Sequence, residues 1–270
     1  PALSFMATID TVLLAGGIPV VVDVDEYYTM DVNQLEDAVK KYNPVCIIPV
    51  HLYGGMADME SIMSLAFKHN IYVLEDAAQA HGASLNGKMA GAIGHVGAFS
   101  FYASKNVPMG EGGAITTSDD TIAKSINSLI DFGDHPALNL RITEFQAALG
   151  YMGLQKLSNL NQKRIENAEF YNKHISDELV KPLKRPNSLH VYHLYTLRHK
   201  NRDNIIQALK KEDIDARVYY TYTLASLRDA IHLPLDRANA YINEVFSIPV
   251  HPYLKDEDLE KIVHVINSNL

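Results

Sequence analysis

The feature that most constrains the fold is an alternation, in the first half of the chain, of short apolar segments with longer helical ones. Five short segments are apolar or rich in β-branched residues and are bounded by turn residues: 19–24, 45–50, 71–75, 97–101 and 113–117. Such segments are typical of strands buried on both faces of a sheet. The helical segments between them are 33–41, which follows the cap-like Asp31, 58–69 and 120–131. The order strand, helix, strand predicts an α/β layer with a mostly parallel sheet and flanking helices.

The second half of the chain predicts a different unit. From residue 143 to about 178 it reads as one long helix with an apolar stripe and no internal proline, which we expect to bridge two domains. After this helix we expect strands at 190–197 and 216–222 and helices at 203–211, 237–244 and 256–266. The sequence therefore predicts a large α/β domain over residues 1–150, followed by the bridging helix and a smaller α+β domain over 151–270.

Composition excludes several classes of protein. With 270 residues, 47% of them hydrophobic, the chain can bury a sizeable core. A net charge of −8 and the lack of a basic cluster argue against a nucleic-acid partner. No segment reads as a membrane span or a signal peptide, so no membrane partner is expected. The single cysteine, Cys46, lies in an apolar run and is expected to be buried; since it allows no internal disulfide, the reducing cytoplasm fits best.

Polar residues that could carry chemistry follow two of the predicted strands. Asp76 ends one strand segment, Ser100 lies near the end of the next, and Lys105 follows five residues later. Ligands of parallel α/β sheets bind at the carboxyl ends of the strands. Glu75 points to the opposite face of its strand from Asp76 and is expected to be structural. A lysine that can form a Schiff base, with a carboxylate that can hold a pyridine nitrogen, is the minimum equipment for pyridoxal phosphate chemistry.

Six motifs of the chain match, in order and at comparable spacing, the motifs of one enzyme family. They are PVHLYG (49–54), EDAAQAHG (75–82), FSFYASK (99–105), GEGGAI (110–115), NLRITEFQAALG (139–150) and LKDED (254–258). On these residues the chain resembles the DegT/DnrJ/StrS-type family of pyridoxal-phosphate-dependent sugar aminotransferases, over essentially its whole length. The resemblance implies the fold type I architecture of these enzymes and pyridoxal 5′-phosphate as the cofactor.

The resemblance implies a role for each residue at the strand ends. Lys105 is the imine former and proton shuttle, the catalytic residue. Asp76 lies against the pyridine nitrogen and keeps it protonated, and Gln79 contacts the cofactor ring or its hydroxyl. Ser100 resembles the hydroxyl that binds the cofactor phosphate, a task that suits a short donor at a strand terminus. No histidine pair has the spacing of metal ligands, so no metal site is expected.

The resemblance also bears on assembly and completeness. Asn139 resembles the asparagine that family members contribute to the cofactor phosphate of the neighbouring subunit, which implies a homodimer with shared active sites. The loop before it, 134–138, is shorter than in typical members. The segment 1–8 resembles one that lies well inside family members, so we expect several tens of upstream residues to be absent. The tyrosine-rich segment 219–225 replaces the family's His-Tyr-Pro stretch, which predicts an unusual substrate pocket.

Three functions follow from these observations. The leading one is transfer of an amino group, with glutamate as the expected donor, to a nucleotide-linked keto sugar in amino-sugar or cell-surface polysaccharide biosynthesis. The second is sugar dehydration, which a branch of the same family performs with a histidine in place of the lysine; Lys105 argues against it. The third is a catalytically silent, truncated member that acts as a dimerising or regulatory module. Cofactor uptake distinguishes the third from the first.

Overall fold

The computed structural model describes residues 1–130 and 138–270, so Asp131 and most of the predicted loop 134–138 lie outside the described residues. Its central sheet has the strand order β2 (Cys46–Ile47), β3 (Tyr72–Asp76), β6 (Val96–Ser100) and β7 (Gly113–Thr116). The first three strands are parallel, and β7 runs antiparallel to β6. The predicted α/β class with a mostly parallel sheet is confirmed.

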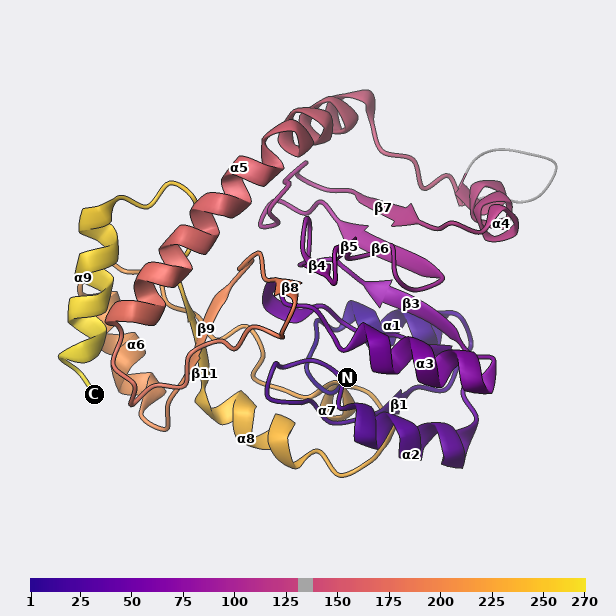
Figure 1. The fold of residues 1–270 in the computed structure, drawn as a ribbon, viewed down its shortest axis with the longest axis horizontal. Helices are drawn as coiled ribbons and strands as arrows, with labels where there is room; N and C mark the ends of the chain where they lie inside the picture. Colours follow the sequence, from indigo (N-terminus) through magenta and orange to yellow (C-terminus); the bar gives the residue numbers. More distant parts are fainter. Residues whose placement is uncertain (131–137) are drawn as a thin grey trace.

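Helices α2 (Val32–Tyr42) and α3 (Met59–His69) begin where acidic residues cap them. The carboxylate of Asp31 accepts hydrogen bonds from two backbone N–H groups of the first turn of α2, and that of Asp58 accepts one from α3. Each helix ends at an asparagine in the left-handed region, which stops the helix without strain. Helix α3 packs on both β3 and α2, and the two helices lie along one side of the sheet (Figure 1).

The long helix expected after residue 143 is α5 (Glu144–His174). It begins with a capping box between Thr143 and Gln146, and it ends at Ile175, a few residues earlier than expected, where the backbone becomes extended. Figure 1 shows α5 running from the side of β7 and α4 (Asp120–Ile130) to the C-terminal helices. The long helix itself is confirmed, and its role as a bridge between two domains stays a prediction.

The C-terminal part is built on an antiparallel pair of strands, β9 (Tyr195–Arg198) and β11 (Val245–Ile248). Three helices accompany this pair: α6 (Arg202–Lys211), α8 (Asp236–Glu244) and α9 (Asp256–Asn267). The strand expected at 190–197 is therefore shorter than predicted, since the residues before Tyr195 form a loop. A small sheet of order β5 (Lys88–Met89), β4 (Ser84–Leu85) and β8 (Ser188–Leu189) joins the two halves. The remaining short helices are η1 (Leu52–Gly54) and α7 (Leu224–Leu227).

Four expectations are corrected. The predicted strand 216–222 is wrong: it makes one isolated bridge, Arg217 to Ser247, and then turns away to bury tyrosines against the first half of the chain. Strand β1 (Val20–Val21) pairs with β10 (Ile231–His232) instead of joining the central sheet. Helix α1 (Ala7–Leu14) was not anticipated. Cys46 is exposed rather than buried, because successive side chains of β2 point to opposite faces and only that of Ile47 enters the core.

Two glycines allow the centre of the sheet to close against a neighbouring loop. A Cβ atom at Gly97 of β6 would overlap the Cα atom of Gly91 and the hydroxyl of Thr116. Gly91 has a φ of +78°, and a Cβ atom there would overlap the ring of Phe99. The hydroxyl of Thr116 donates a hydrogen bond to the Gly91 carbonyl across this contact. The loop before β6 is therefore held against the strand without room for a side chain at either position.

Buried apolar side chains form three main clusters. One lies among α2, α3 and the sheet, and one lies within the C-terminal part around β9, β11, α6 and α9. The third joins distant segments, because Leu3 and Tyr53 pack with Tyr220 and Tyr241. We retain the division at residue 150 as a proposal, in which α5 belongs mainly to the second unit. None of the described helices combines the length and the apolar character needed to cross a lipid bilayer.

Helix α3 offers a matched pair for testing its packing. Ile62 is fully buried beneath the helix, whereas Phe67 on the same helix is 90% exposed. We expect Ile62→Ala to lower the free energy of unfolding by roughly 2–5 kcal/mol, because it leaves a cavity in the core. Phe67→Ala should change it by less than about 0.5 kcal/mol. Urea denaturation of both variants measures the difference, and equal losses would contradict the packing described.

Candidate active site

The site is built at the carboxyl end of β3, where the main chain of Asp76 makes two hydrogen bonds to the segment that follows β2. Its N–H donates to the Pro49 carbonyl (2.8 Å), and its carbonyl accepts from the N–H of His51 (3.0 Å). The carboxylate accepts hydrogen bonds from the hydroxyl of Thr8 (2.8 Å) and the N–H of Ala78 (3.2 Å). Asp76 is thus held at the strand end in one orientation, with its side chain half-buried.

Glu75 faces the other way and is fully enclosed. Its carboxylate bonds to His51 Nε2 (2.8 Å) and accepts hydrogen bonds from the N–H groups of Gly91, Ile93 and Gly94. Burial acts to raise the pKa of Glu75, but the His51 and backbone hydrogen bonds outweigh it and leave the pKa below the ordinary value. Glu75 is therefore satisfied within the fold, as expected of a structural residue.

Lys105 lies in the turn after β6, and its side chain is half-buried. Its N–H donates to the Tyr102 carbonyl (2.9 Å), which closes the turn. Burial lowers the pKa of the Lys105 amine, and the negative charge of Asp76 acts in the opposite direction. The two predicted residues are therefore close enough to interact electrostatically, although 29 positions separate them in the sequence.

Gln79 connects the site to the C-terminal part of the chain. Its side chain is 9% exposed, its Oε1 accepts from the N–H of Tyr53 (2.7 Å), and its Nε2 donates to the hydroxyl of Tyr220 (3.0 Å). Burial raises the pKa of Tyr220, so its hydroxyl stays protonated. The sequence analysis marked the tyrosine-rich segment as unusual but did not single out Tyr220. No local pattern could have done so, because its partner lies 141 positions away.

Ser100 and Asn139 occupy different surroundings. Ser100 ends β6 opposite Gly113, and its Oγ accepts a long hydrogen bond from the N–H of Tyr102 (3.3 Å), which leaves its O–H able to donate. Asn139 is exposed in the segment that leads into α5, with a φ of +51°, and its Oδ1 accepts from Arg141 Nε (3.1 Å). Asp76, Gln79, Ser100 and Lys105 gather around the ends of β3 and β6, whereas Asn139 lies apart, before α5.

His81 is a buried residue beside this cluster whose ring has no hydrogen-bond partner. It is 3% exposed and packs against the rings of Phe99 and Phe101, and both ring nitrogens lack a partner among the described residues. Burial, and then the charge of Lys105, lower the pKa of His81 to about 4. An uncharged histidine therefore lies next to the amine.

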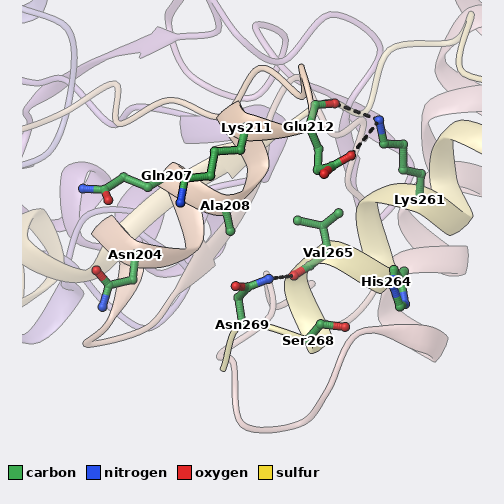
Figure 2. Close-up of a pocket in the computed structure, with 10 residues that line it drawn as sticks. All are labelled: Asn204, Gln207, Ala208, Lys211, Glu212, Lys261, His264, Val265, Ser268 and Asn269. Carbon is green, nitrogen blue, oxygen red and sulfur yellow. Dashed lines mark hydrogen bonds and ion pairs between the residues drawn. The ribbon is translucent and has the colours of Figure 1, made fainter.

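A separate cavity of about 640 Å³ opens between α6 and α9, at the far end of α5 from Asn139. Figure 2 shows Lys261 of α9 reaching Glu212, whose carbonyl accepts its hydrogen bond (2.8 Å), while Asn204 and Gln207 line the α6 side. None of the predicted site residues lines this cavity. The candidate site at the strand ends is therefore separate from this cavity.

The residues at the strand ends fit pyridoxal phosphate. They include an amine whose pKa is lowered, a carboxylate within electrostatic range of it, an amide, and a hydroxyl with its hydrogen free. Lys105 could bind the cofactor covalently, Asp76 and Gln79 could bind its ring, and Ser100 could bind its phosphate. Asn139 is exposed and could reach a second subunit.

Comparison with known proteins places the chain in a family. The model of the DegT/DnrJ/EryC1/StrS aminotransferase family matches residues 1–267. The chain is 35% identical to the UDP-N-acetyl-3-dehydro-alpha-D-glucosamine 3-aminotransferase of Acidithiobacillus ferrooxidans, over 100% of this chain and 76% of that protein. It is also 35% identical to the Pleiotropic regulatory protein of Geobacillus stearothermophilus, over 98% of this chain and 76% of that protein.

Solved structures agree with this placement. DesV of S. venezuelae, solved in complex with a ketimine intermediate, superimposes with a TM-score of 0.93 at 31% identity, covering 99% of this chain and 76% of that chain. The predicted resemblance, the fold type and the cofactor are therefore confirmed. The chain belongs to the DegT/DnrJ/EryC1/StrS family of pyridoxal-phosphate-dependent aminotransferases.

Proposed function

We propose that this protein transfers an amino group from glutamate to a nucleotide-linked keto sugar in amino-sugar or cell-surface polysaccharide biosynthesis. The observation that carries the proposal is the placement of a half-buried lysine, Lys105, in the turn after β6, within electrostatic range of Asp76 at the carboxyl end of β3. The name of the Acidithiobacillus relative, an aminotransferase for a UDP-linked 3-dehydro sugar, supports this substrate class. We place the protein in the cytoplasm, because its single cysteine offers no internal disulfide.

The proposed chemistry divides between the cofactor and the chain. Pyridoxal 5′-phosphate, when bound, would supply an aldehyde carbon that carries the amino group from donor to acceptor and a ring that accepts electrons. We assign to Lys105 the covalent attachment to the cofactor and the movement of the proton at the carbon that gains or loses the amino group. The lowered pKa of Lys105 increases the share of neutral amine at neutral pH, which is the form that acts as nucleophile and base.

The neighbouring residues bind and orient. Asp76, held by Thr8 and Ala78, is assigned to hold the proton at the ring nitrogen. Gln79 is assigned to the ring hydroxyl, and Ser100 to the phosphate. Because Gln79 also donates to Tyr220, the hydroxyl of this tyrosine fixes the orientation of the amide. These assignments rest on the family resemblance of the motifs, and they are supported by the position of each residue near the carboxyl ends of β3 and β6, where ligands of such sheets bind.

We propose that the active unit is a homodimer with shared active sites. Large apolar side chains are exposed in the segment around Asn139 and along the first part of α5: Leu138, Leu140, Ile142, Phe145, Leu149, Tyr151, Met152 and Leu154. A monomer rarely exposes so continuous an apolar surface, and a second copy of the chain would cover it. Asn139 lies within this surface, so it would be carried toward the partner's cofactor phosphate.

A regulatory role is the second candidate. It is favoured by the name of the Geobacillus relative, a pleiotropic regulatory protein that is as similar to this chain as the named aminotransferase. A regulatory member could bind the cofactor without turning it over, or not bind it at all. Sugar dehydration is disfavoured, because Lys105 occupies the position where that branch carries histidine.

Cofactor binding and amino transfer can be tested on the purified protein. We expect added pyridoxal phosphate to give a visible absorption band that glutamate then bleaches, because the amino group passes to the cofactor. Lys105→Ala should give no such band, whereas substitution of the exposed Lys210 by alanine should leave it unchanged. A band that glutamate does not bleach would favour the regulatory candidate, and a band that persists in Lys105→Ala would contradict the assigned lysine.

Sharing of the active sites can be tested by mixing two inactive variants. Lys105→Ala removes the amine, and Asn139→Ala removes the proposed contact with the partner's phosphate. In a mixed dimer one site carries both defects and the other carries neither, so we expect the mixture to regain the glutamate half-reaction that each variant lacks. Asn243→Ala, at an exposed asparagine on α8, is the control for Asn139. If mixing restores nothing while both variants form dimers, each site belongs to one subunit.

The buried histidines predict that acid weakens the fold. The pKa of His81 is lowered to about 4 in the folded state, whereas in the unfolded chain it is about 6.5. Between these two pH values the unfolded chain binds the extra proton, so the free energy of unfolding decreases as the pH is lowered. His81 alone accounts for roughly 3 kcal/mol across this range. We expect urea denaturation at several pH values to show a flatter profile for His81→Phe, whose ring would join Phe99 and Phe101. The same substitution at the exposed His232 should keep the wild-type slope.

A further inference from the structure

A chain of buried hydrogen bonds begins at the residue next to Lys105. Asn106 is 5% exposed, and its Nδ2 donates to Asn161 Oδ1 (2.9 Å) and to the Val191 carbonyl (3.5 Å). Its Oδ1 pairs with His193 Nδ1 (3.1 Å). Asn161, which lies on α5, extends this series of hydrogen bonds, because its Nδ2 donates to the His81 carbonyl (2.8 Å). The Asn106 side chain thus ties the turn of Lys105 to α5 and to the 191–193 loop, and Asn161 extends these contacts to residue 81.

The directions of these bonds are fixed at both ends by main-chain carbonyls. A carbonyl can only accept, so the Val191 carbonyl requires the NH₂ group of Asn106, and the His81 carbonyl requires that of Asn161. The carboxamide oxygen of Asn106 must then face His193. An oxygen of this kind cannot donate, so the hydrogen lies on His193 Nδ1, and Nε2 carries a lone pair.

The surroundings keep His193 uncharged. It is 7% exposed, and burial first, then the charges of Lys105 and Arg164, hold its pKa well below the ordinary value. Arg164 donates to the carbonyls of Tyr192 and His193, which fixes this loop from the side of α5. The pKa values of Lys105, His81 and His193 thus depend on one another. The charges of Asp76 and Arg164 also contribute, Asp76 at Lys105 and Arg164 at His193.

The tight contact between α5 and residue 82 supports a fixed geometry. A Cβ atom at Gly82, where φ is +84°, would lie 2.8 Å from Asn161 Nδ2. This position favours glycine, so the main chain at residue 81 can approach α5 closely enough to accept the hydrogen bond. The conformation of the backbone at residues 81 and 82 therefore allows this hydrogen-bond network to form.

We propose that Asn106 is a positioning residue for Lys105, which acts through Asn161 and His193 to hold the backbone of the catalytic turn in one place beside an uncharged histidine. A lysine that detaches from the cofactor and returns in every turnover cannot anchor itself by its amine. The buried amide of the next residue supplies the anchor, so that the amine moves while its Cα atom stays fixed. The inference rests on the role proposed for Lys105.

Two buried asparagines on α5 provide a matched test. Asn161 and Asn167 are 5% and 6% exposed, and each donates to a main-chain carbonyl, of His81 and His251 respectively. Both Asn161→Leu and Asn167→Leu should lower the stability of the fold. Only Asn161→Leu should also loosen the turn of Lys105, hydrate its amine and raise the apparent pKa of Lys105 by about one. NMR titration of labelled lysine, assigned with Lys105→Ala, measures this in the cofactor-free protein.

A second measurement reads the histidine directly. Nitrogen-15 NMR should find His193 in the wild-type protein with its hydrogen on Nδ1, and the signal should lose this signature in Asn106→Ser, whose hydroxyl is too short to reach His193. Asn106→Ser, the milder change, should raise the apparent pKa of Lys105 as Asn161→Leu does. A hydrogen on Nε2, or equal pKa values of Lys105 in Asn161→Leu and Asn167→Leu, would overturn the proposal. Both measurements are made without cofactor or sugar. They can therefore contradict the positioning role of Asn106 while the proposed amino transfer is upheld, or support that role while amino transfer is contradicted.

Discussion

The geometry of the strand ends depends on the buried carboxylate of Glu75. This group collects hydrogen bonds from His51, which follows β2, and from the backbone before β6, so it ties the three parallel strands together at one level. A buried carboxylate without these partners would cost several kcal/mol. Because successive side chains on a strand point to opposite faces, fixing Glu75 inward also fixes Asp76 outward. The short connection after β6 then brings Lys105 within electrostatic range of Asp76.

The sequence was sufficient to predict those parts of the fold that depend on interactions between residues close together along the chain. Asp31 and Asp58 cap their helices because a carboxylate can reach the first N–H groups wherever it precedes a helical segment. The parallel strands and α5 have strong local patterns, and the family motifs singled out Asp76 and Lys105, which lie near the strand ends where ligands of such sheets bind. Local information also explains one error: the tyrosines of 216–222 have high β propensity, which tertiary packing overrides.

The remaining features depend on contacts between distant segments. Tyr220 meets Gln79 and Tyr53, Asn106 meets His193, and Asn161 meets the carbonyl of residue 81. Each partner is an ordinary polar or aromatic residue in an unremarkable local setting, so no spacing rule identifies it. The exposure of Cys46 likewise depends on which face of β2 the rest of the chain covers. The C-terminal part of the chain therefore helps to build the site, because Tyr220 and His193 contact residues at the strand ends.

The contact between Gly91 and Gly97 restricts how this sequence can change over evolutionary time. A side chain at position 97 meets the main chain of residue 91, and one at position 91 meets the ring of Phe99, so neither mutation can be accommodated by a rotamer change alone. The loop that begins at Gly91 also supplies the N–H groups that hold Glu75. A mutation that replaces either glycine would therefore disturb the strand ends from a distance of several residues. Neither glycine can be replaced unless the contact between the loop and β6 also rearranges.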